Sequence, residues 1–283
     1  MTEHEDYTIV IKPKSSIWDI NFKEIWRYKD LLFLLVRRDF VSVYKQTILG
    51  PVWFFLQPVL TTATFTLVFS MLAKIPTNGI PPPLFYLIGV TFWNYFSTCL
   101  TTTSSTFVSN AAVFGKVYFP RLIMPLSVVI SSLIKLSIQF LLLIIVWVYY
   151  LATDVSVIPN FTALMLPAYI VLMAGLGLGF GIILSSITTK YKDFSFLIAF
   201  GVQLLMYATP VIYPYNLIPD PRIKLLVSLN PMTGLIEGIK YGLTGSGTFD
   251  IILLTYSFVF TLVILFIGVI VFNKVEKSFI DTV

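Results

Sequence analysis

Five long stretches of this sequence contain no charged residue, and they restrict the environment in which the chain can fold. They cover residues 46–73, 75–115, 155–189, 194–219 and 251–273, which are 28, 41, 35, 26 and 23 residues long. A helix needs about 20 mainly apolar residues to cross the hydrocarbon core of a bilayer, so each stretch is long enough. Only 12% of the residues are charged, about half the share of a typical soluble domain. We therefore expect a polytopic membrane protein, with membrane lipids as partners and no nucleic acid, despite the sequence pI of about 9.1.

Start and stop signals along the chain give about six expected spans, the third of which is interrupted by Lys135. They lie at residues 49–73, 84–108, 125–151, 161–187, 194–213 and 250–272. Every span is expected to be a helix, because a helix satisfies its own backbone hydrogen bonds in lipid, whereas a lipid-exposed strand does not. The expected fold class is therefore an all-α polytopic membrane protein.

The positions of lysine and arginine set the expected orientation of these spans. With the N-terminus inside, 14 of the 19 basic residues lie on cytoplasmic segments, and four lie outside: Lys74, Arg222, Lys224 and Lys240. Both termini are therefore predicted to be cytoplasmic. The first 30 residues lack an apolar core, so we expect no cleaved signal peptide. The expected regions are a cytoplasmic N-terminal segment at 1–47, a transmembrane domain at 48–273 and a cytoplasmic tail at 274–283.

A short amphipathic helix is expected before the first span. Trp18, Phe22 and Trp26 recur at helical spacing, while charged residues occupy another face. Such a helix suits the membrane interface, with aromatic side chains in lipid and cations toward anionic headgroups. It is either a simple topology anchor or a movable element beside a pore.

The outer segment at 214–249 combines four prolines with apolar stretches that are too short to span. This composition predicts short re-entrant helices in the outer leaflet, which are tolerated where protein or a water-filled cavity surrounds the backbone.

The usual residues of catalysis and ion coupling are scarce. The only histidine is His4 and the only cysteine is Cys99. No Asp or Glu lies in the interior of an expected span, where proton-coupled and many ion-coupled transporters place carboxylates. The sequence also lacks the phosphate-binding loop of an ATPase. The glycine run from Gly175 to Gly181 lies inside a span and is interpreted as close helix packing rather than as a dinucleotide-binding turn.

One lysine falls within an expected span. Lys135 shares a helix face with Ser131 and Gln139, because residues four apart lie on the same side. Its side chain either snorkels to the interface or contacts an anionic headgroup. Most aromatic residues of the spans are interpreted as interface belts and lipid-facing packing, and a minority are candidates for stacking against sugar rings.

Several sequence blocks, in order along the chain, resemble one membrane-protein family. The two specific blocks are Arg38–Phe40 followed by Tyr44–Pro51, with Trp53 and Gln57–Pro58, and Lys116–Arg121 with Pro125. The supporting blocks are Ala208–Pro214, Asn230–Met232 with Glu237, and Phe272–Asn273 with Glu276 and Phe279. From about residue 30 onward, the chain is similar to the membrane-spanning permease subunit of ABC-type polysaccharide exporters.

This resemblance implies a type-2 ABC exporter permease with six spans, which pairs with itself as a homodimer. It also implies two copies of a separate nucleotide-binding ATPase, which hold ATP and Mg, so that no cofactor is expected on this chain. The implied substrate is an undecaprenyl-pyrophosphate-linked glycan, foremost the O-antigen of lipopolysaccharide. The expected location is the bacterial plasma (inner) membrane.

The same resemblance suggests roles for individual residues. Coupling to the ATPase is expected at Lys116, Tyr118 and Arg121, and a gate helix at Trp18, Phe22 and Trp26. The lipid pyrophosphate is expected to enter beside Arg37, Arg38 and Lys45, because cations are natural charge partners of phosphate. The candidates for lining the channel are Trp53, Tyr86, Trp93, Lys135 and Tyr207.

Three other functions stay open at this point. A capsular polysaccharide or teichoic-acid exporter would share the same architecture. A secondary transporter is disfavoured by the lack of carboxylates in the spans. A membrane glycosyl- or acyltransferase would need an acidic or histidine catalytic group near the interface.

Overall fold

The computed structural model describes residues 22–45, 50–114, 119–153 and 157–280. All regular structure within these ranges is helical. The α-helices are α1 (Phe22–Arg27), α2 (Lys29–Lys45), α3 (Trp53–Phe65), α4 (Pro82–Ser104), α5 (Thr106–Ser109), α6 (Ala111–Phe114), α7 (Ile123–Thr153), α8 (Leu166–Lys190), α9 (Phe194–Tyr207), α10 (Pro221–Ser228), α11 (Pro231–Thr244) and α12 (Ile251–Ile280). Short 3-10 turns lie at Gly50–Val52, Phe161–Met165 and Tyr215–Leu217, and a π-helix at Thr66–Leu72 extends α3.

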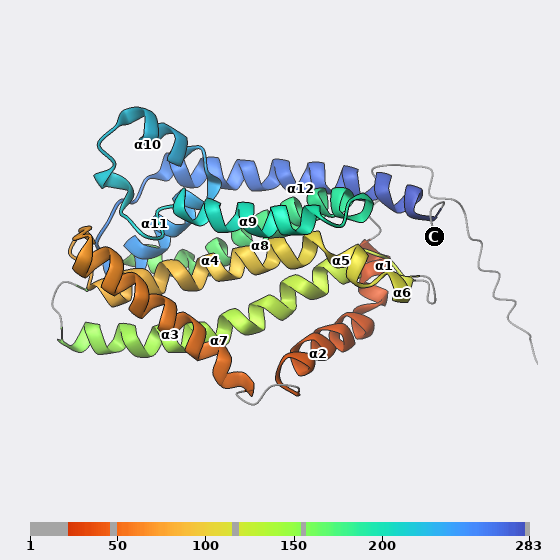
Figure 1. Cartoon of the computed structure of the whole chain (residues 1–283), viewed down its shortest axis with the longest axis horizontal. Helices are drawn as coiled ribbons and strands as arrows, with labels where there is room; N and C mark the ends of the chain where they lie inside the picture. Colours follow the sequence, from red (N-terminus) through yellow and green to blue (C-terminus); the bar gives the residue numbers. More distant parts are fainter. Residues whose placement is uncertain (1–21, 46–49, 115–118, 154–156, 281–283) are drawn as a thin grey trace, which may run out of the picture.

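The long helices run back and forth along the long axis of the molecule (Figure 1). Helices α7 and α9 run from the end that carries α1 and α6 toward the end that carries α10, α3 runs toward that end from near α2, and α4, α8 and α12 return. The helical part of the chain therefore starts and finishes at the same end, as the predicted orientation requires.

Four segments are long and apolar enough to cross a membrane: Trp53–Leu72, Ile123–Thr153, Phe161–Lys190 and Ile251–Lys274. They coincide with the first, third, fourth and sixth expected spans. The second expected span forms α4, which has 23 residues but falls outside this apolar set. The fifth forms α9, which has 14 residues and is therefore about 21 Å long.

Helix α9, which forms the fifth expected span, ends at Tyr207, although the sequence predicted that this span continues to residue 213. Pro210 explains the difference, because proline has no backbone N–H to donate and disfavours a helical conformation at the preceding residue. Thr209, Pro210, Val211 and Ile212 are buried, so protein shields this non-helical backbone, as membrane depth would require.

Helix α4 is the centre of the structure. Most of its side chains from Leu84 to Phe96 are buried, and α8, α7 and α3 pack around it. Lipid tails are as apolar as these side chains, so close van der Waals packing, rather than a hydrophobic driving force, must hold the helices together.

The glycines of α8 permit this packing on two sides. A Cβ atom at Gly177 would lie 2.6 Å from Cys99 Cβ of α4, and one at Gly181 would lie 2.5 Å from Thr103 Cβ. On the opposite side, a Cβ atom at Gly179 would lie 2.6 Å from Ile264 Cγ2 of α12. The interpretation of this run as a helix-packing surface is confirmed.

Short helices occupy the segment at 214–249, as expected. Asp220 and Asn230 cap α10 and α11, each accepting a hydrogen bond from the backbone N–H two residues later. Pro221 and Pro231 follow the caps at the first helical position, where proline has no N–H to lose. At the other end of α11, Gly245 adopts a φ of 70°, and a Cβ there would lie 2.3 Å from Ile158 O. Only glycine suits that position.

Candidate functional site

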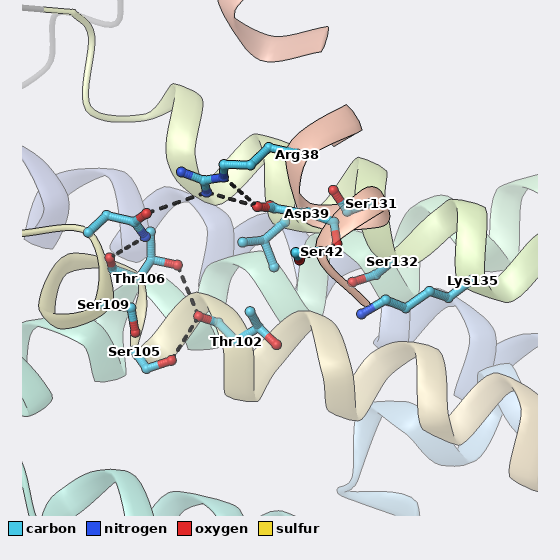
Figure 2. Close-up of a pocket in the computed structure, with 12 residues that line it drawn as sticks. Arg38, Asp39, Ser42, Thr102, Ser105, Thr106, Ser109, Ser131, Ser132 and Lys135 are labelled. Atoms are coloured by element: carbon cyan, nitrogen blue, oxygen red, sulfur yellow. Dashed lines mark hydrogen bonds and ion pairs between the residues drawn. The ribbon is translucent and has the colours of Figure 1, made fainter. Parts of the chain in front are cut away.

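A polar cavity of about 290 Å³ lies where α2, α4, α5 and α7 meet (Figure 2). Two cations, one carboxylate, several hydroxyls and an amide surround it, and Val128 is its one apolar lining residue. The lining residues are Arg38, Asp39, Ser42, Thr102, Ser105, Thr106, Ser109, Asn110, Val128, Ser131, Ser132 and Lys135.

Helical periodicity aligns these side chains. On α7, Val128, Ser131, Ser132 and Lys135 are spaced at i, i+3, i+4 and i+7, so they share one face. On α2, Leu35 and Val36 are buried. Leu35 belongs to an apolar cluster with Phe119, Ile123 and Met124, and this cluster anchors α2 against the start of α7. The polar residues of α2 that follow then lie at the cavity.

Arg38 connects α2 with the turn between α5 and α6. Its Nε and Nη2 donate to Asp39 Oδ1 at 3.0 and 2.8 Å, and Nη2 also lies 3.5 Å from Asn110 Oδ1. Asn110 in turn donates from Nδ2 to Thr106 O. The Arg38 side chain is 44% exposed, so this ion pair contributes little to stability and can exchange partners.

Lys135 and Ser131 lack such partners. The Ser131 hydroxyl is buried, with the residue 5% exposed, and has no hydrogen-bond partner among the described residues. Lys135 is half-buried and forms no ion pair or hydrogen bond within the described ranges. It lies 12 residues after the start of α7, about 18 Å along the helix. Figure 2 shows its ammonium end toward the same cavity that Arg38 borders.

The structure brings together residues from two predicted sets. Arg38, expected where the lipid pyrophosphate enters, and Lys135, expected to line the channel, border one cavity. Arg37 and Lys45 are exposed and do not line it.

The predicted coupling and gate residues lie only partly in the described chain. Arg121 is near Phe114, with its Cζ 5.9 Å from the ring centroid. Trp26 is 74% exposed and lies under Lys29 Nζ at 5.8 Å. Lys116, Tyr118 and Trp18 lie outside the described residues, and so does the side chain of Phe22.

The predicted channel-lining aromatics separate into two groups. Trp53 and Tyr207 are about half exposed. Tyr86 and Trp93 are 0% and 3% exposed, and Tyr86 packs edge-on against Phe65 and Phe85. Tyr86 and Trp93 therefore belong to the packed core of the single chain.

The sequence analysis did not predict a buried ion pair on α11, because it counted Lys240 among the basic residues of the outer segments. Lys240 is 1% exposed and its Nζ lies 3.7 Å from Glu237 Oε1. The ammonium also donates to Pro210 O and lies 3.5 Å from the centroid of the Phe85 ring. Burial raises the pKa of the Glu237 carboxyl, and the Lys240 charge opposes that shift. The spacing Glu-x-x-Lys in an apolar segment was the available clue.

Metal chemistry finds no support in the described part of the chain, where no group of His, Cys, Asp and Glu side chains can hold a metal ion.

The alternating helices, the four apolar spans and the interior built around α4 define a multi-pass helical membrane protein. The family model for ABC-2 type transporters matches residues 30–244. The chain therefore belongs to the ABC-2 type transporter family and is a membrane transport subunit rather than an enzyme.

Proteins similar to this chain carry more specific names. The O-antigen export system permease protein RfbA of Myxococcus xanthus is 27% identical over 77% of this chain and 82% of its own length. An RfbA of Klebsiella pneumoniae is 24% identical over 89% of this chain and 94% of its own length. The polysialic acid transport protein KpsM of Escherichia coli is 23% identical over 89% of this chain and 95% of its own length.

Proposed function

We propose that this chain is the permease of an ATP-driven exporter of lipid-linked O-antigen. The observation that carries the proposal is the similarity to O-antigen export permeases over 77% to 89% of the chain. The polar, cationic cavity supports it, because the carrier lipid of such a glycan presents a pyrophosphate group.

In this proposal the protein lies in the bacterial inner membrane with both termini in the cytoplasm. The helices α3, α4, α7, α8, α9 and α12 make six crossings, and α10 and α11 dip into the outer leaflet. Two copies of the chain form the channel, with Trp53 and Tyr207 as candidate lining residues because they expose aromatic surface.

Energy comes from two copies of a separate ATPase, which bind ATP and Mg. They dock on the loop at 110–121, so movement in the ATPase is transmitted to α4 and α7, which flank that loop. Arg37, Arg38 and Lys45 attract the anionic lipid headgroup toward α2, and Trp18, Phe22 and Trp26 form the gate helix beside it.

The decisive experiment is complementation in a strain that lacks its own O-antigen permease. The chain and its cognate ATPase are expressed together, and long-chain lipopolysaccharide is measured at the cell surface. Surface O-antigen supports the proposal, whereas glycan retained in the cytoplasm, with the complex intact, contradicts it.

Coupling to the ATPase is tested by charge reversal at Arg121. Arg121→Glu is expected to reduce stimulation of the ATPase in proteoliposomes at least about threefold, because it replaces a positive charge with a negative one at the proposed interface. Arg222→Glu, which reverses an exposed charge on α10, is the matched control and is expected to leave stimulation unchanged. Equal stimulation by wild type and Arg121→Glu would remove Arg121 from the coupling interface.

A capsular polysaccharide exporter is the second candidate. The polysialic acid transport relatives align over 95% of their own length, so the architecture suits either substrate. Mass spectrometry of the lipid that copurifies with the complex distinguishes the candidates by the carrier and its glycan.

A further inference from the structure

Ser131 is an exception among the hydroxyl residues of α7. Ser127 donates to Met124 O and Ser137 to Leu133 O, so both satisfy their hydroxyls on the backbone of their own helix. The Ser131 hydroxyl is buried and makes no such bond, and Ser131 is one of the residues that line the cavity. A buried hydroxyl without a partner costs about 1–3 kcal/mol. A ligand in the cavity would supply the missing partner.

The charges around the cavity also favour a ligand there, and they favour an anion. Arg38 and Lys135 contribute two positive charges and Asp39 one negative charge. Asp39 is hydrogen-bonded to Arg38 and is close enough to Lys135 for a favourable charge interaction. One unit of positive charge is left uncompensated, in a site where the remaining polar groups are hydroxyls and one amide.

The size and depth of the cavity suit an anionic lipid headgroup. Its volume of about 290 Å³ exceeds the roughly 30 Å³ occupied by one water molecule several-fold. Ser131 and Lys135 lie eight and 12 residues into α7, about 12 and 18 Å from its start. That depth suits a headgroup that remains attached to a lipid in the same leaflet.

We propose that this cavity binds a phosphate group of a lipid-linked pyrophosphate, with Lys135 and Ser131 as its deep ligands. Asp39 acts as an internal counter-ion that holds Arg38 until the phosphate takes the place of the Asp39 carboxylate. The lipid source rests on the proposed function, whereas the phosphate chemistry rests on the cavity itself. Because Arg38 also contacts Asn110, occupation of the cavity changes a contact at the start of the loop at 110–121.

The test is equilibrium binding of undecaprenyl pyrophosphate to the full-length chain in phosphatidylcholine nanodiscs, with inorganic pyrophosphate as competitor. Lys135→Gln is expected to weaken binding at least about tenfold, since it removes a charge-assisted hydrogen bond. Ser131→Ala is expected to weaken it about threefold, and Asp39→Asn to tighten it about threefold, because it frees Arg38. Lys192→Gln, which neutralises an exposed lysine outside the cavity, serves as the charge-matched control and is expected to bind as wild type.

Several outcomes decide the proposal. Binding by Lys135→Gln within twofold of wild type overturns it, and so does weaker binding by Asp39→Asn. If Lys135→Gln does not fold, Lys135→Arg and Asp39→Asn carry the test, because the first must bind within about fivefold of wild type and the second must bind more tightly. Competition by inorganic pyrophosphate in wild type but not in Lys135→Gln assigns the site to phosphate alone. Lipid binding that depends on Lys135 without such competition assigns it to the lipid headgroup.

Failure of this inference is distinguishable from failure of the proposed function. If wild type and Lys135→Gln both export O-antigen and bind the lipid equally, only the cavity assignment falls. If lipid binding depends on Lys135 but the wild type exports no O-antigen, the assignment of the exported glycan falls and the phosphate site stands.

Discussion

Lys240 is buried and Lys135 is half-buried, and the two lysines differ in the partners of their charge. Lys240 is held by Glu237, by the Pro210 carbonyl and by the face of Phe85. Lys135 faces a cavity and has no hydrogen-bond or ion-pair partner among the described residues. A buried cation that pairs with a carboxylate and donates to a carbonyl stabilises one arrangement of helices. Lys135 lies beside the Ser131 hydroxyl, which also lacks a partner among the described residues, and is the side chain that we propose binds phosphate.

The surroundings of the two lysines differ in packing as well. Around α11 and α8, glycines bring backbones so close that an added Cβ would lie within 3 Å of a neighbouring atom. Around Lys135, small hydroxyl residues leave open space instead. Helix α4 takes part in both regions, since it packs against α8 along its length and borders the cavity with Thr102 near its end. Glycines therefore close one region, and small hydroxyl residues leave space in the other.

Removing each lysine tests this contrast most strongly. Lys240→Met is expected to lower the free energy of unfolding by about 3–5 kcal/mol, because it leaves the Glu237 carboxylate buried without its partner. Lys135→Met is expected to change it by less than about 1 kcal/mol, since Lys135 forms no direct ion pair or hydrogen bond within the described ranges and Asp39 keeps its bond to Arg38. Equilibrium denaturation in detergent micelles measures both, and equal losses would show that the two sites do not differ in this way. The double variant Glu237→Gln with Lys240→Met should recover part of the loss.

Adding bulk in each region gives the next largest effect. Gly181→Val places a Cβ atom 2.5 Å from Thr103 Cβ, and such overpacking costs about 1–3 kcal/mol. Ser131→Val, which enlarges a side chain beside the cavity, is expected to cost less than about 1 kcal/mol because space is available. Gly201→Val on α9 is the control, since nothing lies within 4 Å of its added Cβ. A stable Gly181→Val protein would mean that α8 does not depend on its glycines.

A single hydrogen bond between helices gives the smallest effect. Thr188 of α8 donates its hydroxyl to Ser104 O of α4, and Thr188→Val is expected to cost about 1 kcal/mol. The adjacent Thr189 donates to Ser185 O within its own helix, so Thr189→Val is expected to cost less than about 0.5 kcal/mol. Melting temperatures of the two variants compare them directly, and an equal decrease would assign no special role to the α8–α4 contact.

Much of this architecture was predictable because the limits on a chain in lipid are simple. The charge-free stretches indicated the apolar spans other than α7, which contains Lys135. The glycine run indicated a packing surface, and the prolines of 214–249 indicated short helices. The length of α9 was missed, because its apolar stretch continues past Tyr207 and only the backbone effect of Pro210 ends the helix. An apolar composition predicts that a segment lies in the membrane, but it does not show where a single proline ends the helix.

The site was only partly predictable for a different reason. Lys135 and Ser131 share a face that helical spacing reveals, but the contribution of Arg38 depends on how α2 folds back against α7. The burial of Lys240 depends on contacts with Phe85 and Pro210, which lie 155 and 30 residues earlier in the chain. Such pairings arise from tertiary packing, and periodicity within one segment does not show them.

In the proposed arrangement of six crossings and two copies, the shortness of α9 has a consequence for the surrounding bilayer. Its apolar length of about 21 Å is less than the hydrocarbon thickness of roughly 30 Å, and Phe196 and Phe200 on it are 79% and 59% exposed. This hydrophobic mismatch is relieved by local thinning of the bilayer beside α9 or by a second copy of the chain that covers it. Membranes of shorter acyl chains therefore fit this side of the protein better, so lipid thickness becomes a variable that acts on one helix more than on the others.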